Sequence, residues 1–134
     1  MRTEELRIGN LVYSGFRVVD VVDSIERSVF VVNYIVNFSD GENCEVEEIN
    51  PIPITTKWLE RLQFRKDDNG NYWVDLVTFY FEIIPGKDGF YPVIGQGAEI
   101  SAETEQRVTL NCIKYIHELQ NLYFALTGEE LKIK

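Results

Sequence analysis

Short apolar runs separated by turns of hairpin length make up most of this chain of 134 residues. Residues 39–41 (Ser-Asp-Gly), 67–70 (Asp-Asp-Asn-Gly) and 85–89 (Pro-Gly-Lys-Asp-Gly) are of the types that close tight turns. Hairpins join antiparallel neighbours, whereas parallel strands need a long crossover connection. The spacing therefore predicts a mostly antiparallel sheet, with strands within residues 11–49 and 72–109.

The first fifty residues have the densest strand signals. Val, Ile, Phe and Tyr, which suit a pleated surface, concentrate at 11–13, 16–22 and 28–37, with a polar connection at 23–27. From 44 to 49, Cys, Val and Ile alternate with three glutamates, which is typical of a strand with one solvated face. Four or five short strands in so few residues favour a small SH3-like barrel or half-barrel.

The second half predicts strands and a short helix. Thr55 or Thr56 is suited to cap a helix over about 56–63, with Trp58 and Leu59 on its apolar side. The run from Tyr72 to Ile84 is too long for one ordinary strand, so two strands or a bulge are expected there. Further strands are expected at 90–94 and within 99–109, with a loop at 95–97 between them.

A long C-terminal helix over about 112–126 is the clearest element. At 100° per residue, its apolar side chains cover an arc of about 200°, and Gly128 follows as a left-handed stop. Ile116, Leu119, Tyr123 and Leu126 are expected to be its most buried residues. Because the arc exceeds one sheet-facing stripe, its flanks are expected to contact either the short helix or a second subunit. A homodimer is therefore one of two expectations.

Together these elements predict an α+β fold with both helices outside the sheet. The length suits a single domain over residues 1–134, with a β-rich half at 1–50 and an α+β half at 51–134. No linker, repeat or low-complexity tract interrupts the chain.

The charge disfavours nucleic acid as a partner. The formal net charge is −9, and residues 1–50 carry ten carboxylates against four arginines. Without a cluster of Lys and Arg, so acidic a chain repels phosphate backbones. The start has no signal-peptide pattern, and no segment reaches the roughly 18 apolar residues of a membrane span. A cytoplasmic location without membrane contact is expected, with Cys44 and Cys112 as free thiols.

Three blocks of sequence resemble a known family. They are residues 6–12 (LRIGNLV), residues 51–55 (PIPIT) with Trp58-Leu59, and residues 116–131 (IHELQNLYFALTGEEL), of which the last is the most specific. They resemble a family of small uncharacterised proteins carried by Bacteroidetes chromosomes, prophages and other mobile elements. The resemblance implies a genomic context of that kind and no activity, cofactor or catalytic residue.

No residue pattern indicates catalysis, a metal or a cofactor. His117 is the one histidine, and the neighbouring Glu118 projects about 100° away, so a surface or boundary histidine is expected. A cysteine nucleophile would need a base and a polarised pocket, so Cys44 and Cys112 are expected to be core or half-buried. Gln120 falls within the apolar arc, where its amide needs partners. We expect it to hydrogen-bond a strand or loop backbone, with a ligand-facing amide as the alternative.

The leading expectation for function is a non-enzymatic module of a mobile element or prophage that binds another protein. Its candidate contact residues are the strand aromatics Trp73, Tyr80, Phe90 and Tyr91. An alternative is an acidic DNA mimic that inhibits a nucleic-acid-binding protein through the carboxylates of residues 42–48. The third possibility is a small enzyme with a pocket near His117 and Gln120.

Overall fold

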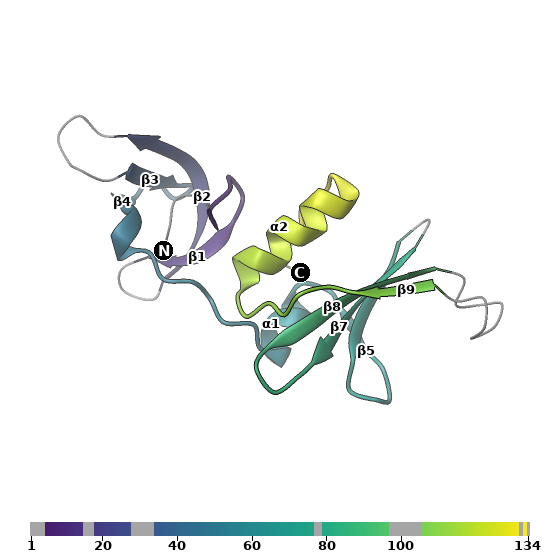
Figure 1. The fold of residues 1–134 in the computed structure, drawn as a ribbon. Coiled ribbons are helices and arrows are strands. Elements are labelled where there is room, and N and C mark those ends of the chain that lie inside the picture. The colour runs from purple at the N-terminus through teal and green to yellow at the C-terminus, as the bar shows by residue number, and fades with distance from the viewer. Residues whose placement is uncertain are drawn as a thin grey trace. The chain divides into compact units, whose positions relative to one another are not determined.

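The chain folds into two compact units, seen in the computed structural model of Figure 1. The residues that the structure describes are 5–14, 18–27, 34–76, 79–96, 106–131 and 133. Unit 1 comprises residues 1–53 and 115–131, and unit 2 comprises residues 54–114 and 132–134. Each unit contains an antiparallel sheet and a helix, so the predicted α+β class is confirmed. The expectation of a single domain over 1–134 stays a prediction.

Unit 1 begins with a four-stranded antiparallel meander in the order β1-β2-β3-β4. Its strands are β1 (Leu11–Ser14), β2 (Val18–Arg27), β3 (Tyr34–Phe38) and β4 (Asn43–Glu45). The predicted turn at 39–41 joins β3 to β4, where Gly41 donates its N–H to the carbonyl of Phe38 over 3.0 Å. After the 3-10 helix η2 (Val46–Glu48), Asn50 and Tyr13 of β1 exchange two backbone hydrogen bonds of 2.9 Å. This return to the first strand curls the sheet, as expected for an SH3-like half-barrel.

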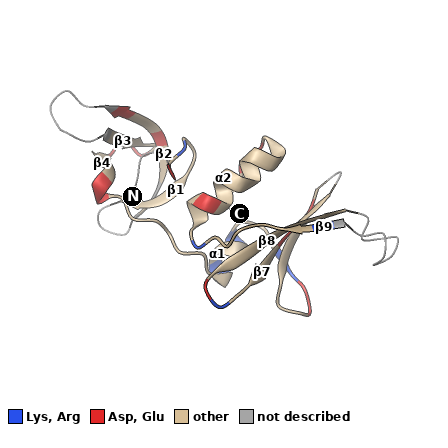
Figure 2. Cartoon of the chain, viewed as in Figure 1, with Lys and Arg blue, Asp and Glu red and all other residues tan. Residues whose placement is uncertain are grey.

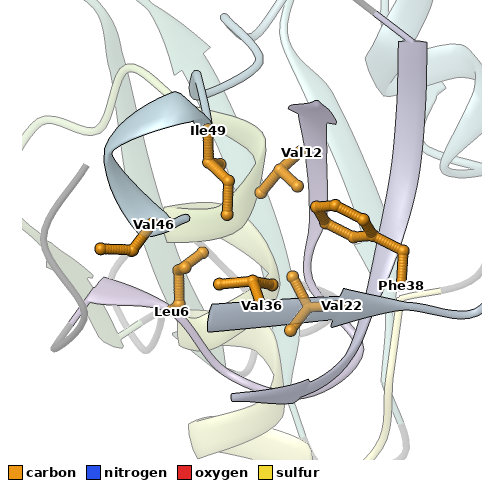
Figure 3. Close-up of a cluster of buried hydrophobic side chains, with 7 residues drawn as sticks. All are labelled: Leu6, Val12, Val22, Val36, Phe38, Val46 and Ile49. Atoms are coloured by element: carbon orange, nitrogen blue, oxygen red, sulfur yellow. The ribbon is translucent and has the colours of Figure 1, made fainter. Parts of the chain in front are cut away.

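The core of unit 1 lies inside this curl, where side chains of the strands and of η2 converge (Figure 3). Its members are Leu6, Val12, Val22, Val36, Phe38, Val46 and Ile49. Small branched side chains dominate the set, which suits a tightly curved sheet. Cys44 packs against the core from its edge and is half-buried, as expected.

Two strand boundaries of unit 1 differ from the expectation. The predicted strand over 44–49 is wrong after Glu45, because the Glu48 carboxylate accepts the N–H of Glu45 and favours the 3-10 turn of η2. The predicted polar connection at 23–27 is also wrong. Those residues continue β2 opposite β3, past a register shift between Val22 and Ser24. Of the strand predicted at 28–37, residues 28–33 lie outside the described residues.

The long helix α2 (Ile116–Thr127) belongs to unit 1, and its predicted start at 112 is wrong. Ile113 is extended and exchanges two backbone hydrogen bonds of 2.8 Å with Phe90, so that stretch cannot be helical. Gly128 ends the helix at φ +74°, as predicted for a left-handed stop. Ile116, Leu119 and Tyr123 are buried as expected, whereas Leu126 is only half-buried.

Unit 2 begins with the short helix α1 (Thr56–Arg61). The predicted cap is confirmed at Thr55, whose hydroxyl accepts the N–H of Trp58 over 3.2 Å. The helix ends two residues earlier than predicted, because Gln63 has a positive φ of 70° that no helix tolerates.

The sheet of unit 2 is a five-stranded antiparallel meander in sequence order. Its strands are β5 (Arg65–Lys66), β6 (Tyr72–Asp75), β7 (Tyr80–Pro85), β8 (Phe90–Gln96) and β9 (Gln106–Thr109). The split of 72–84 into two strands is confirmed. The loop predicted at 95–97 is wrong for Gly95 and Gln96, which continue β8 opposite β9. The part of the predicted strand region that spans 99–105 lies outside the described residues.

Most of the core of unit 2 lies on one face of its sheet, although Val93, which pairs with Glu82 on the other face, is also only 1% exposed. Leu59, Tyr72, Phe81 and Ile83 are at most 1% exposed. Phe64, which follows α1, places its ring centroid 6.1 Å from that of Phe81. No helix among the described residues has the length and apolar composition that crossing a membrane requires.

Candidate functional site

The sheet of unit 2 presents aromatic side chains on the face opposite Phe81 and Ile83. Side chains alternate between faces along a strand, and directly paired antiparallel residues share a face. Trp73 pairs with Glu82, which lies two residues from Tyr80 on β7. Tyr91 pairs with Ile84, again two residues from Glu82. Trp73, Tyr80 and Tyr91 therefore lie on one face, and all three are half-buried.

An arginine extends this surface at the edge strand β5. Arg65 pairs with Trp73, and its guanidinium carbon lies 4.1 Å from the centroid of the tryptophan ring. The same guanidinium contacts the carboxylate of Asp75 at 3.1 Å, and both side chains are about two-thirds exposed. We call the surface formed by Arg65, Trp73, Tyr80 and Tyr91 the aromatic face.

Phe90, the fourth predicted contact residue, does not belong to the aromatic face. It pairs with Pro85, two residues from the buried Ile83, so it lies on the core side of the sheet. Its side chain is half-buried there. The sequence contained the signal for this difference, because Phe90 and Tyr91 are neighbours on one strand and must point to opposite faces.

Two glycines fix the tyrosine rings of the aromatic face. The Tyr80 ring lies over Gly95, with which it is paired across β7 and β8, and a Cβ at Gly95 would overlap it. The Tyr91 ring lies in the same way against Gly86. A glycine beside an aromatic residue on a neighbouring strand is a known way to hold a ring in place. The two rings therefore pack closely against the backbone at these glycines.

In unit 1, a polar network joins the N-terminal segment to α2, and Gln120 is at its centre. Its Oε1 accepts the backbone N–H of Leu11 over 2.8 Å, and its Nε2 donates to the carbonyl of Gly9 over 3.2 Å. The side chain is 1% exposed. The expectation that a buried Gln120 binds strand or loop backbone is confirmed, and both polar atoms of the amide have partners.

Asn121 and Arg7 extend this network towards the surface. Asn121 donates to the carbonyl of Glu5 over 3.0 Å and accepts from the amide of Asn10 over 2.8 Å. Arg7 pairs with the Glu130 carboxylate and lies over the Phe124 ring at 4.2 Å. Apart from Glu5, these residues lie within two blocks of the sequence, residues 6–12 and 116–131. Those blocks therefore meet in space, and their polar residues dock α2 against the N-terminal segment.

The network predicts a measurable loss when the Gln120 amide is removed. Gln120→Met keeps the length of the side chain but leaves the Leu11 N–H and the Gly9 carbonyl unpaired in a buried site. We expect the free energy of unfolding of unit 1 to fall by about 1–3 kcal/mol in urea titrations followed by circular dichroism. An unchanged urea midpoint would show that water replaces both hydrogen bonds at no cost.

His117 is buried, which corrects the expectation of a surface or boundary residue. It is 3% exposed, and its ring stacks on that of Tyr115 with centroids 5.9 Å apart. Helical spacing could not show this contact, because Tyr115 is extended and precedes the helix. Among the described residues, Nδ1 has no hydrogen-bond partner. Burial lowers the pKa of His117, while the nearby Glu118 and Glu5 carboxylates act in the opposite direction.

This burial predicts a stability loss in mild acid. Since the folded pKa lies below the ordinary value near 6.5, the unfolded chain binds the proton more readily. Neutral His117 makes its full contribution to the free energy of unfolding above about pH 6.5. This contribution is lost as the pH falls from there towards the folded pKa. Urea midpoints measured from pH 7.5 to 5 should fall more steeply in the native chain than in His117→Gln. Because the chain has one histidine, parallel curves would refute this assignment.

The entire net charge resides in unit 1. By sequence, unit 1 holds thirteen Asp and Glu against four Arg, which gives −9, and unit 2 holds nine acidic and nine basic residues. Figure 2 shows acidic segments along the β2–β4 region and η2. Glu42, Glu47 and Glu48 are exposed, whereas Glu45 is half-buried.

The remaining reactive side chains are dispersed. Within the described part of the chain, no group of three His, Cys, Asp or Glu residues could hold a metal ion. Cys44 and Cys112 lie in different units and form no disulfide within the described part of the chain, and Cys112 donates to the carbonyl of Ile113 over 3.8 Å. Both are half-buried, as expected.

No protein-family model matches the chain, and no curated protein or solved structure is significantly similar to it.

Proposed function

We propose that the protein is a non-enzymatic interaction module that binds another protein through the aromatic face of unit 2. The observation that carries this proposal is the arrangement of Trp73, Tyr80 and Tyr91. They share the sheet face opposite Phe81 and Ile83, and each side chain remains partly exposed. The family resemblance adds a mobile element or prophage as the genomic context of the proposal.

The composition of the aromatic face supports a protein partner. Trp, Tyr and Arg are the residues enriched among those that dominate binding energy at protein interfaces. Their rings supply a large contact area at a small cost in conformational entropy. The glycines beneath Tyr80 and Tyr91 lower that cost further, because rings already held in place lose little freedom on binding.

Photocrosslinking tests this proposal. A photoreactive phenylalanine analogue is placed at Trp73 or Tyr91 in the full chain, and at exposed Lys57 of α1 as a control. Irradiation in host cytoplasm should attach one protein at positions 73 and 91 and none at 57. That protein, once purified, should bind the native chain, and Trp73→Ala should weaken the complex by about 30-fold or more.

Two arginines provide a matched control. Arg65 stacks on Trp73 at 4.1 Å, and Arg61 stacks on Trp58 of α1 at 4.3 Å. Each loses the same contact with a tryptophan ring when it is replaced by alanine. Arg65→Ala should weaken binding of the crosslinked protein, whereas Arg61→Ala should leave the dissociation constant unchanged. Equal effects of both substitutions would contradict binding through the aromatic face.

A second candidate function, an acidic DNA mimic, is favoured by the confinement of the charge to unit 1. Exposed Glu42, Glu47 and Glu48 lie close together in the sequence, around β4 and η2. A protein that inhibits a nucleic-acid-binding protein would offer such carboxylates in place of phosphates.

Competition with DNA separates the two candidates. Host DNA-binding proteins enriched on phosphocellulose are offered to the immobilised chain, with and without duplex DNA. Mimicry predicts retention that falls with salt, that duplex DNA abolishes, and that E42Q/E47Q/E48Q removes. Neutralising Glu60, Asp68 and Asp88 of unit 2 is the control and should have no effect. Retention that survives duplex DNA would contradict mimicry.

A further inference from the structure

Unit 2 is an insertion within unit 1. Unit 1 is interrupted after Pro53 and resumes at Tyr115. Residues 54–114 therefore separate α2 from the rest of unit 1 in the sequence. Nevertheless α2 is hydrogen-bonded to the N-terminal segment, through Gln120 to Leu11 and through Asn121 to Asn10. Unit 1 is therefore discontinuous in sequence, whereas unit 2 is continuous apart from its last three residues.

The two crossing points are paired with each other. In unit 1, Pro53 and Tyr115 form an antiparallel bridge, and Ile116 donates its N–H to the carbonyl of Ile52 over 2.8 Å. Residues 52–53 and 115–116, where unit 1 is interrupted, thus form a short two-stranded ladder. It brings the start of α2 next to the segment that follows the first sheet.

Unit 2 closes its own two ends in the same way. Ile54 donates its N–H to the carbonyl of Lys114 over 2.9 Å, and Ile113 exchanges two backbone hydrogen bonds of 2.8 Å with Phe90 of β8. Folding of unit 2 therefore places residues 54 and 114 side by side. Without it, unit 1 would have to close a loop as long as residues 54–114, at an entropic cost that grows with loop length.

We propose that residues 54–114 form an inserted module that folds by itself and whose folding closes the surrounding unit. Among its described residues, unit 2 has its own sheet and its own helix, and each strand pairs with its neighbour in the sequence. Unit 1 needs both its halves and carries the whole net charge of −9, whose self-repulsion weakens it. On this proposal, unit 1 opens first and the module remains folded.

The chain contains separate optical probes for the two units. Its two tryptophans, Trp58 and Trp73, both lie in unit 2, so tryptophan fluorescence reports that unit alone. Circular dichroism at 222 nm reports mainly unit 1, because α2 has 12 residues and α1 has 6. Both signals are followed in one urea titration of the full chain.

A matched pair of substitutions decides the question. Ile116 in α2 and Ile83 in β7 are both 0% exposed, and replacing either with valine removes one methylene group. Ile116→Val should lower the dichroism midpoint by roughly 0.5 M urea and leave the fluorescence midpoint unchanged. Ile83→Val should lower the fluorescence midpoint by a similar amount, which shows that the probe responds to the same chemical change.

A single cooperative domain predicts a different result. Both probes would then give one coincident transition, and Ile116→Val would shift fluorescence and dichroism together. A fluorescence midpoint that moves with Ile116→Val would therefore overturn the proposal. A wild-type chain whose dichroism midpoint lies at a higher urea concentration than its fluorescence midpoint would also overturn the proposal. Unit 1 would then remain folded after the module that closes it has unfolded.

Discussion

Replacing Phe81 with alanine is expected to lower the free energy of unfolding of unit 2 by about 3–5 kcal/mol. Phe81 is 0% exposed, lies on the middle strand of its sheet and contacts the ring of Phe64. Alanine would leave a cavity that the paired strands cannot fill, since their hydrogen bonds hold them in register. A domain has a total stability of roughly 5–15 kcal/mol, so this variant would be partly unfolded at 37 °C.

Urea titration followed by tryptophan fluorescence measures this loss. Phe124→Ala is the matched control, because Phe124 is 39% exposed and loses mainly its contact with the Arg7 guanidinium. Its expected cost is about 1 kcal/mol or less, in unit 1 rather than unit 2. Equal losses from the two substitutions would show that the core does not lie on the Phe81 face of the sheet.

Replacing Leu119 with alanine should lower the free energy of unfolding of unit 1 by about 2–5 kcal/mol. Leu119 is 0% exposed and lies beside Gln120, whose amide binds the N-terminal segment. Alanine would leave a cavity beside the buried face of α2. Because α2 is joined to the sheet of unit 1 through its buried face, we also expect faster hydrogen exchange along α2 and β1.

Dichroism at 222 nm in urea measures the stability of this variant, and Leu122→Ala is its control on the same helix. Leu122 is half-buried, so its truncation should cost clearly less than that of Leu119. A Leu119→Ala chain with an unchanged urea midpoint would refute the burial of this side chain.

The proposed binding surface and the inserted module lead to a connected expectation. A partner that binds the aromatic face stabilises the folded form of unit 2 by mass action. If folding of unit 2 closes unit 1, the same partner should raise the stability of α2 as well. Slower hydrogen exchange in residues 116–127 on partner binding would support that link.

The sequence alone was sufficient to predict the features of this protein that depend on local chemistry. The turn at 39–41, the cap at Thr55 and the left-handed stop at Gly128 depend on the residue's own φ and hydrogen-bonding groups. Antiparallel pairing followed from the short connections, and the burial of Leu119 followed from helical periodicity. These features need only a few neighbouring residues, so a sequence is sufficient to predict them.

The tertiary structure decided what depends on segments far apart in the chain. Residues 112–113 have an apolar helical pattern, yet pairing with Phe90 makes them extended. Burial of His117 depends on stacking with Tyr115 ahead of the helix, and the separation of Phe90 from the aromatic face depends on the register of β7 and β8. The insertion of unit 2 is the largest such feature. It rests on hydrogen bonds between Gln120 and residues 9 and 11, which no periodicity or propensity encodes.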